Sequence, residues 1–188
     1  NYYSAVDAYN SALTRSTPSG LSQARANLAA TSVGDYALFG GGYSSGYYSA
    51  VDAYNSALTR STPTALSQAR SSLAATSVGD YALFGGGSTA VDAYNSALTR
   101  STPTALSQAR SSLAATSVGD YALFGGGYGS GNYYSAVDAY NSALTRSTPT
   151  ALSQARDSLA ATSVGDYALF GGGYKNDTFA VVDAYTLV

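Results

Sequence analysis

Residues 66–87 read Leu-Ser-Gln-Ala-Arg-Ser-Ser-Leu-Ala-Ala-Thr-Ser-Val-Gly-Asp-Tyr-Ala-Leu-Phe-Gly-Gly-Gly, and this stretch decides the fold. It recurs almost unchanged from Leu21, Leu106 and Leu152. Four copies this similar indicate recent duplication of one supersecondary unit, which packs against its neighbours along the chain. The fold therefore has to be derived from one unit and from the way in which the units stack.

A second block alternates with the first and reads Ala-Val-Asp-Ala-Tyr-Asn-Ser-Ala-Leu-Thr-Arg-Ser-Thr-Pro. It begins at Ala5, Ala50, Ala90 and Ala136, and a truncated copy, Val182–Tyr185, follows near the end. We expect one domain over residues 1–188. Its expected repeats lie near 21–65, 66–105, 106–151 and 152–188, with 1–20 as a partial unit that completes the ring.

Each unit reads as four short β-strands. Gly34-Asp35 suits a two-residue turn with positive φ, the triple glycine from Gly40 ends a β-prone run, and Pro63 stops the last strand. The alternative is a helix over 65–75, which contains good helix formers but lacks a wide apolar stripe of period 3.6. We favour strands, which in the first unit are expected at 28–33, 36–39, 50–54 and 58–61.

Composition excludes several classes of function. The 188 residues carry a net charge of −2, with 45% apolar and 11% charged residues, and they include no Glu, His, Cys, Met or Trp. No disulfide, zinc or haem ligand set, or thiol or imidazole nucleophile can be built, so we expect no cofactor. The charge gives no basic surface for nucleic acid, and no apolar run is long enough for membrane insertion.

The two ends of the sequence differ in character. The sequence begins at Asn1, inside a repeat and without an initiator Met, which we interpret as a processed, trimmed or excerpted start. The ending Tyr185-Thr-Leu-Val188 departs from the repeat, which favours a genuine C-terminus over a genuine N-terminus.

Four short strands in every 40 to 46 residues are typical of a β-propeller blade. The unit also resembles the kelch repeat, through Arg25 before the first strand, the double glycine at Gly40 and Tyr54 in the third strand. The resemblance covers essentially the whole chain. It departs from the family at the tryptophan that follows the tyrosine, where Leu58 stands nearest. The expected fold is all-β, a kelch-like propeller of four near-identical repeats with four-stranded blades.

Ring closure is the unresolved part of this expectation. The sequence holds four copies of strands one, two and four, but five of strand three. We expect four blades with closure shared between the termini, in which Leu13–Ser16 supplies the fourth strand missing after Tyr185. Ala5–Tyr9 and Val181–Tyr185 then compete for one third-strand position. A larger ring would need a second chain or residues outside this sequence.

The copies differ mainly between the triple glycine and the third strand, and three of these loops are rich in tyrosine. Tyrosine offers a large amphipathic contact area, and Ser, Gly and Asn adapt around it, as in binding loops. The loop at Ser88-Thr89 is too short to contribute. The alternative is that these are merely soluble connections. The expected ligand-binding residues are Tyr43, Tyr47, Tyr48, Tyr128, Tyr133 and Tyr134, with Tyr174 at the margin.

Two series of arginines repeat. The first series lies just before each inner strand, near the face and the central channel, where it could meet an anionic ligand. Because every copy has the arginine, we favour a structural role, in which it bonds to carbonyls or to an Asp in a neighbouring blade. It comprises Arg25, Arg70, Arg110 and Arg156. The second is expected to be a solvated outer edge that discourages edge pairing. It comprises Arg15, Arg60, Arg100 and Arg146.

Aspartates also form two series. Those at Asp35, Asp80, Asp120 and Asp166 suit the turns, through local bonds to the backbone. Those at Asp7, Asp52, Asp92, Asp138 and Asp183 are expected to pair with an Arg or with backbone donors in the third strand. No calcium-loop pattern is present, so no metal site is expected. Near-perfect repetition leaves no unique pair of carboxylates, so the chain is not expected to be an enzyme.

These observations predict a non-catalytic binding module that presents its tyrosine loops to a surface glycan or protein. The repeats also resemble kelch-type arrays encoded by gut bacteria and their phages, which implies a phage tail or bacterial surface protein, located extracellularly or on a virion. The alternative is a self-assembling structural subunit of a phage appendage or fibre, because spare third strands at both ends allow strand addition between chains.

Overall fold

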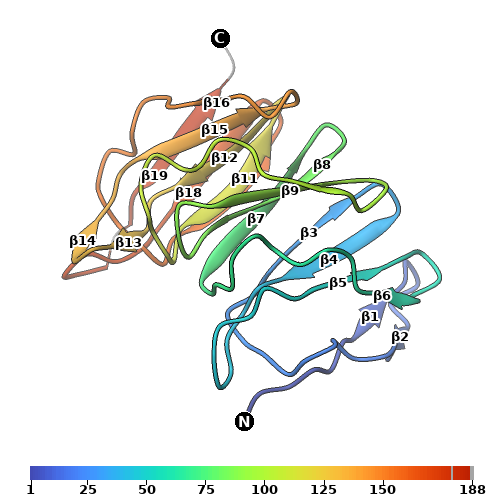
Figure 1. The fold of residues 1–188 in the computed structure, drawn as a ribbon. Helices are drawn as coiled ribbons and strands as arrows, with labels where there is room; N and C mark the ends of the chain where they lie inside the picture. The colour runs from blue at the N-terminus through green and yellow to red at the C-terminus, as the bar shows by residue number, and fades with distance from the viewer. Residues whose placement is uncertain (179, 187–188) are drawn as a thin grey trace.

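The computed structural model describes residues 1–178 and 180–186, and within these ranges the chain is all-β with no helix. Successive antiparallel sheets follow one another from the N-terminus to the C-terminus, which lie at opposite ends of the molecule (Figure 1). This arrangement is compatible with the expected propeller-like stacking. The expectation of an all-β fold is confirmed.

Three sheets each have four strands in the described residues. Sheet 1 contains β3 (Ala29–Val33), β4 (Tyr36–Gly40), β5 (Val51–Tyr54) and β6 (Arg60–Ser61). Sheet 2 contains β7 (Leu73–Val78), β8 (Tyr81–Gly86), β9 (Val91–Asn95) and β10 (Arg100–Ser101). Sheet 3 contains β11 (Ala114–Val118), β12 (Tyr121–Gly125), β15 (Val137–Asn141) and β16 (Arg146–Ser147).

The remaining strands form smaller units. Sheet 4 contains β17 (Ala160–Val164), β18 (Tyr167–Gly171) and β19 (Val182–Thr186). The N-terminal hairpin contains β1 (Ala8–Tyr9) and β2 (Arg15–Ser16). A loop hairpin on sheet 3 contains β13 (Tyr128–Gly129) and β14 (Asn132–Tyr133).

The four strands expected in the first unit are found within two residues of their predicted bounds. Gly34 has φ of 51°, as the tight turn between β3 and β4 requires. Residues 65–72 form a loop and residues 73–75 begin β7, so the helical alternative is wrong. Leu58 lies in the hairpin between β5 and β6 with φ of 58° and is 38% exposed, so it does not fill the role of a buried tryptophan.

The core is divided among the interfaces between neighbouring sheets. Each interface joins the Val and Leu side chains of one sheet to the Phe and Tyr side chains of the next. Between sheets 1 and 2, for example, Val33 and Val51 share a cluster with Phe84 and Tyr94, whose rings meet edge to face at 6.0 Å. Every sheet therefore has an aromatic face toward the preceding sheet and an aliphatic face toward the following one.

Glycine allows the sheets to approach closely. A methyl group added to Gly85, at the end of the second strand in sheet 2, would lie 2.9 Å from the ring of Phe124 in sheet 3. Backbone bonds fix the same stacking, because the amide of Ser72 donates to the carbonyl of Asn27 at 2.9 Å, and Ser112 donates to Ser72 at 2.8 Å. The stacking is thus equivalent at each interface.

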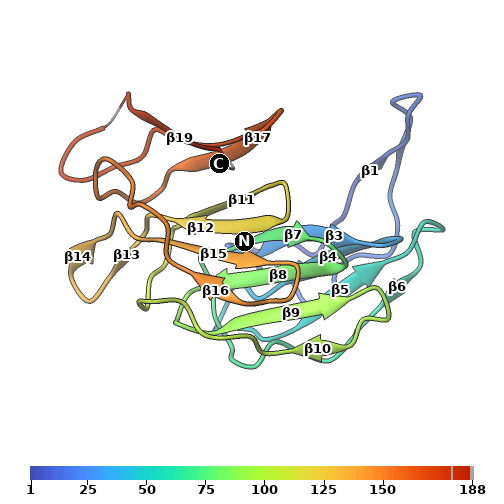
Figure 2. The ribbon, with the colours of Figure 1, turned by 90° about the horizontal axis from the view of Figure 1, so that it is seen from above.

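The expected sharing of a sheet by the two termini is not found. Strand β2 pairs with β1, and sheet 4 has three strands in the described part of the chain, so Leu13–Ser16 does not complete it. The two third-strand copies, in β1 and β19, do not compete, because they belong to different sheets. The physical reason is that the repeated stacking leaves the N-terminal hairpin and sheet 4 at opposite ends of an open array (Figure 2).

Candidate functional site

The variable loops place their tyrosines in two separate clusters. The C-terminal tyrosine cluster consists of Tyr128, Tyr133 and Tyr174, contributed by the loops of sheets 3 and 4. The ring centroids of Tyr128 and Tyr133 are 5.0 Å apart, and those of Tyr133 and Tyr174 are 6.1 Å apart, both edge to face. Tyr128 and Tyr133 are directly opposite each other across β13 and β14, so a two-residue turn with positive φ at Ser130 and Gly131 aligns them.

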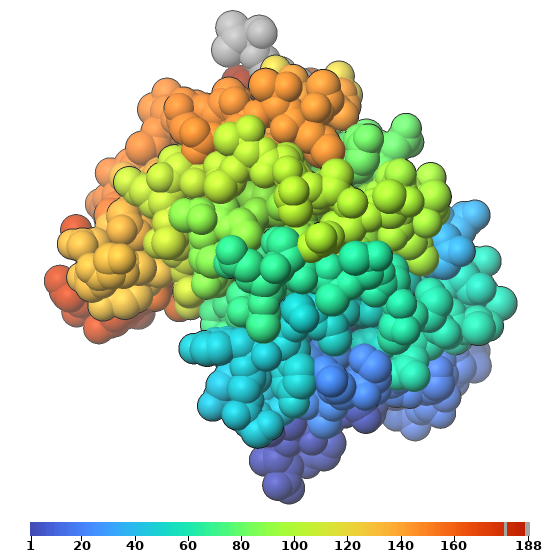
Figure 3. All heavy atoms as spheres, viewed as in Figure 1, coloured from blue at the N-terminus to red at the C-terminus, as the bar shows by residue number. Residues whose placement is uncertain are grey.

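The N-terminal tyrosine cluster consists of Tyr2, Tyr43 and Tyr47. The ring of Tyr43 lies 5.5 Å from that of Tyr47 and 6.2 Å from that of Tyr2. In Figure 3 the gold residues near 130 lie beside the red residues of the C-terminal region, whereas the cyan residues near 45 form a different part of the surface. The expected surface is therefore divided in two.

Tyr48 and Tyr134 have a different position from the clustered tyrosines. Their amides donate to the carbonyls of Gly42 and Gly127 at 2.9 and 2.8 Å, and their carbonyls accept from the amides of Arg70 and Arg156 at 3.1 Å. Both side chains are half-buried. Their backbones join a loop to the following sheet, so a substitution at either position acts on stacking as well as on the surface.

The C-terminal cluster offers aromatic surface with polar groups at its edge. Tyr128 and Tyr174 are exposed, and Tyr133 lies between them. Desolvation, followed by the charges of Tyr174 and Asp157, raises the pKa of Tyr133 above its ordinary value, so this hydroxyl remains a neutral donor and acceptor. Lys175, next to Tyr174, lines a shallow depression of about 520 Å³ with Ser153, Gln154 and Ala155.

The loop that carries Tyr43 and Tyr47 makes polar contacts that differ from those of the C-terminal tyrosine cluster. The hydroxyl of Tyr48 lies 2.8 Å from the hydroxyl of Ser44, and hydrogen bonds from Ser44 and Ser45 lower the pKa of Tyr48. This loop has no paired strands like those of β13 and β14; it is closed by a single bridge between Tyr43 and Tyr47. Tyr43 and Tyr47 are thus presented by a less regular loop, and Tyr2 joins them from the segment before β1.

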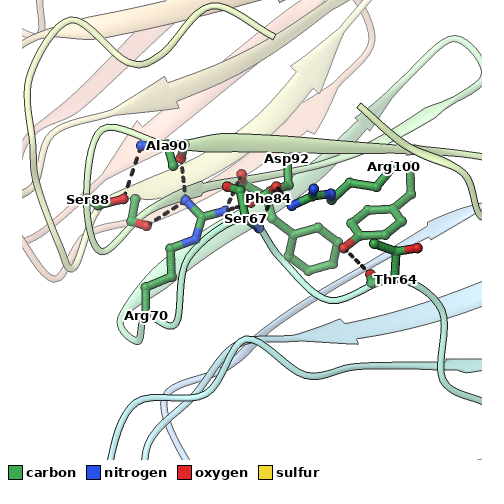
Figure 4. A network of polar contacts seen from close by, with 10 residues as sticks. Thr64, Ser67, Arg70, Phe84, Ser88, Ala90, Asp92 and Arg100 are labelled. Carbon is green, nitrogen blue, oxygen red and sulfur yellow. Dashed lines mark hydrogen bonds and ion pairs between the residues drawn. The ribbon is translucent and has the colours of Figure 1, made fainter. Parts of the chain in front are cut away.

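The arginines expected near the channel face are buried, and each pairs with an aspartate of its own sheet. In sheet 2, Arg70 Nη2 lies 2.6 Å from Asp92 Oδ2 and donates to the carbonyl of Phe84 at 3.1 Å (Figure 4). Buried ion pairs of this kind need such additional bonds to offset desolvation. The equivalent pairs are Arg25–Asp52, Arg110–Asp138 and Arg156–Asp183, at 2.9, 2.7 and 2.7 Å.

This burial corrects the suggestion that Arg25, Arg70, Arg110 and Arg156 face an anionic ligand, because each residue is at most 3% exposed. Arg70 Nη1 also donates to the carbonyls of Gly86 and Ala90, next to the short loop of sheet 2. In sheets 1 and 3, which have long loops, the Nη1 atoms of Arg25 and Arg110 are buried without a protein partner. The alternative of structural bonds is the one found, within a sheet rather than between sheets.

The outer arginines are not simply a solvated edge. Arg100 and Arg146 lie 3.3 and 3.1 Å from the second oxygen of the same aspartates, Asp92 and Asp138. Their side chains are only about one quarter exposed, at 25% and 26%. The prediction of a solvated edge was wrong here because the aspartate lies between two arginines. Arg60 makes the equivalent contact with Asp52 at 3.6 Å, and Arg15 pairs with Asp7 at 3.6 Å on the surface.

The strand aspartates of sheets 1 to 3, Asp52, Asp92 and Asp138, are bonded through both carboxylate oxygens, whereas Asp7 is exposed. Ser67 donates both its amide and its hydroxyl to Asp92, at 2.9 and 3.1 Å, and equivalent serines do so in sheets 1 and 3. The following tyrosine, Tyr94, donates its hydroxyl to the carbonyl of Thr64 at 2.7 Å. This network holds the loop before each first strand against the third strand, and it leaves no free carboxylate oxygen for chemistry.

Within the described ranges 1–178 and 180–186, no group of three or more acidic side chains is positioned to hold a metal ion. These ranges also contain no helix of the length and apolar character needed to cross a membrane. Phe179, at the end of the fourth variable loop, and residues 187–188 lie outside the described part of the chain.

Comparison with known proteins adds no assignment. No protein-family model matches the chain, and no curated protein matches it.

One member of the surface was missed from the sequence. Tyr2 joins Tyr43, although it was not among the expected ligand-binding residues. The signal was present, because Tyr2-Tyr3-Ser4-Ala5 repeats the Tyr-Tyr-Ser-Ala sequence of residues 47–50 and 133–136. It was missed because residues 1–20 were considered only as a partial unit.

Proposed function

We propose that the chain is a non-catalytic recognition module, a kelch-like propeller array whose C-terminal tyrosine cluster binds a surface glycan. The observation that carries the proposal is the meeting of Tyr128, Tyr133 and Tyr174 from two sheets on one exposed surface. Three rings at angles to one another form an apolar surface with hydroxyls at its border, which suits the faces and hydroxyls of sugar rings.

The surroundings of the cluster support an uncharged ligand. The nearby charges, which include Asp157, Lys175 and Asp177, are of mixed sign. The four arginines of the first series are buried in ion pairs and do not attract an anion to the surface. A non-catalytic role is supported by the strand aspartates, which are held by arginine and serine. The N-terminal tyrosine cluster has the same residue type in a different loop, so it provides an internal comparison.

A glycan array with three proteins tests the proposal. We expect Tyr128→Ser/Tyr133→Ser/Tyr174→Ser to bind its best glycan at least tenfold more weakly than the unmodified chain, about 1.4 kcal/mol. The matched control is Tyr43→Ser/Tyr47→Ser, which should bind as the unmodified chain does. Loss in the control alone would move the site to the N-terminal cluster. Binding to surface proteins but to no glycan would overturn the ligand class.

The alternative role, a self-assembling subunit, depends on the two ends of the array rather than on the tyrosines. Self-assembly is compatible with recognition, because the three tyrosines of the C-terminal cluster lie in the segments between β12 and β15 and between β18 and β19.

A further inference from the structure

The two ends of the array expose apolar residues that inner sheets bury. On sheet 4, Val164 and Val182 are both 64% exposed, whereas their equivalents in sheet 3, Val118 and Val137, are 5% and 2% exposed. The difference lies in the neighbour, because the sequences are the same. Sheet 4 therefore exposes an aliphatic face. At every interface inside the chain, a face of this kind is covered by the aromatic face of the next sheet.

The first specific feature of this face is a place for a phenylalanine ring. In each interface a phenylalanine lies against the first glycine of the preceding Gly-Gly-Gly triplet; a methyl group added to Gly125 would be 2.7 Å from the Phe170 ring. At the equivalent Gly171, the only neighbour within 4 Å among the described residues is Val182, at 3.6 Å. A hollow of about 280 Å³ opens there, lined mainly by apolar atoms of Ala160, Ala161, Leu169, Gly171 and Val182.

The second feature is a hollow of about 310 Å³ between sheets 3 and 4, lined by residues that include Val118, Tyr121 and Leu123. At the interface of sheets 1 and 2, the equivalent residues Val33, Tyr36 and Leu38 belong to a cluster against which Leu98 packs. Leu98 comes from the hairpin between the third and fourth strands of sheet 2, and sheet 4 has no such hairpin among its described residues.

The N-terminal end carries the matching parts. Leu13, the equivalent of Leu98, is 81% exposed in the hairpin of β1 and β2. Phe39 in β4, the equivalent of Phe170, is only half-buried and lines a hollow of about 360 Å³ in front of sheet 1. Asp7, before β1, has only a surface contact with Arg15, at 3.6 Å. Inside the array the counterparts of Phe39 and Asp7 are buried, and Leu98 and Leu144, two counterparts of Leu13, are partly buried.

We propose that a second copy of the chain docks head to tail, with its N-terminal hairpin replacing β19 beside β18 and its sheet 1 covering sheet 4. One placement then seats Leu13 in the hollow between sheets 3 and 4 and Phe39 against Gly171. Asp7 takes the place of Asp183 beside Arg156. The exchange is between matching sequences, since residues 6–9, which lead into and form β1, and residues 182–185 of β19 both read Val-Asp-Ala-Tyr. The hairpin also brings a fourth strand, which sheet 4 lacks among its described residues.

The geometry points to a second copy rather than to closure within one chain. The three interfaces repeat the same contacts, so each sheet is rotated in the same way relative to the one before it. After three such rotations the two end faces of the array lie apart (Figure 2). Closure within one chain would have to bring these separated end faces together, which requires a change in at least one of the three interfaces. A second copy that is added with the same rotation between sheets leaves the three interfaces unchanged. It also continues an interface that the chain already forms three times.

The contact is heterologous, because an aromatic face meets an aliphatic face. Such contacts produce a ring if the rotation closes and an open polymer if it does not. Either product supports the proposal, which requires only that one copy's N-terminal end meets the next copy's sheet 4. The tyrosine clusters play no part in it, so it does not depend on the proposed function.

The decisive experiment measures mass by sedimentation over a concentration series, with two variants that each disable one end. Val164→Glu places a charge on the aliphatic face, and Leu13→Ser/Phe39→Ala removes the two residues that dock. The unmodified chain is expected to form dimers or larger assemblies, and each variant to weaken assembly at least tenfold. An equimolar mixture of the two variants should form a 1:1 dimer and nothing larger, because one intact interface remains.

Two further variants test the strand exchange. Asp7→Asn alters a surface pair in the free chain, so its unfolding should be unchanged while assembly weakens at least tenfold. Asp183→Asn weakens the attachment of β19 to sheet 4. Its assembly should therefore be as strong as that of the unmodified chain, or stronger. The opposite ranking of these variants would overturn the exchange.

The matched control is Tyr47→Ser, which should assemble as the unmodified chain does. Circular dichroism and thermal unfolding establish that every variant is folded before its mass is interpreted. The proposal is overturned if the unmodified chain stays monomeric up to about 100 µM, well above the range of a typical specific interface. It is equally overturned if folded Val164→Glu assembles like the unmodified chain, or if the mixed variants remain monomers.

Discussion

Sheets 3 and 4 contain the same first two strand sequences, Ala-Ala-Thr-Ser-Val and Tyr-Ala-Leu-Phe-Gly, but they differ in burial. In β11 the alternate residues are buried, whereas in β17 four of five residues are exposed. Sheet 3 has neighbours on both sides, and sheet 4 has one neighbour in the chain. The comparison teaches that burial here belongs to the interface rather than to the strand, as expected for a linear array of repeats.

The largest difference between inner and end sheets should come from the phenylalanines. Phe124→Ala removes a fully buried ring and should lower the free energy of unfolding by about 3–5 kcal/mol. Phe39→Ala removes a half-buried ring and should cost about 1–2 kcal/mol. Urea unfolding of both variants in the Val164→Glu background, which prevents assembly, measures the two values. Equal losses would show that the N-terminal face is covered in the free chain.

A smaller difference is expected from adding one methyl group. Gly125→Ala forces a methyl group to 2.7 Å from the Phe170 ring, and overpacking of this kind costs about 1–3 kcal/mol. Gly171→Ala meets nothing closer than 3.6 Å, so the stability of the free chain should not change. The same unfolding assay measures both variants, and assembly of Gly171→Ala should nevertheless weaken. A destabilised Gly171→Ala monomer would mean that this position is already occupied.

The smallest expected effect is a response of sheet 4 to acid. Burial alone would raise the pKa of Asp183, but hydrogen bonds from Ser153 and the nearby Arg156 outweigh it, and the pKa lies below the ordinary 3.8. A depressed pKa in the folded state stabilises the fold above pH 3.8, and this contribution is lost as the pH falls further. Amide exchange in β19 should therefore accelerate below pH 3.8.

The control for this response is Asp183→Asn in the same monomeric background. Because asparagine does not titrate, exchange in β19 should be faster at neutral pH and should then change less on acidification. An acid response that persists unchanged in the variant would have to be assigned to another group.

Much of the fold could be predicted because each repeat contains glycines that mark its turns and the ends of its strands. Gly34 marks the turn and the triple glycine ends β4, so the strands of sheet 1 were placed within two residues. The strand aspartates are expected from the sequence to pair with an Arg or with backbone donors, and Asp92 makes both kinds of contact. The sequence did not show that one aspartate lies between two arginines, since this depends on the position of the short fourth strand.

The surface and the ends were harder to predict. Tyr128, Tyr133 and Tyr174 come from loops of different length and sequence, and only the stacking of sheets 3 and 4 brings Tyr174 to Tyr133. Sharing of one sheet by the termini was expected from the number of strand copies. That number carries no information on the rotation between neighbouring sheets, which is a property of the packing at each interface.

The contact between phenylalanine and glycine also has an evolutionary consequence. Because the ring of any sheet fits the glycine of any other, a recombination event that deletes or duplicates one whole repeat in register creates no new interface. Long stretches of identical sequence favour such events. The number of sheets can therefore change in a single genetic step at almost no cost in stability, while the variable loops, and the tyrosines that they carry, are redistributed into new combinations.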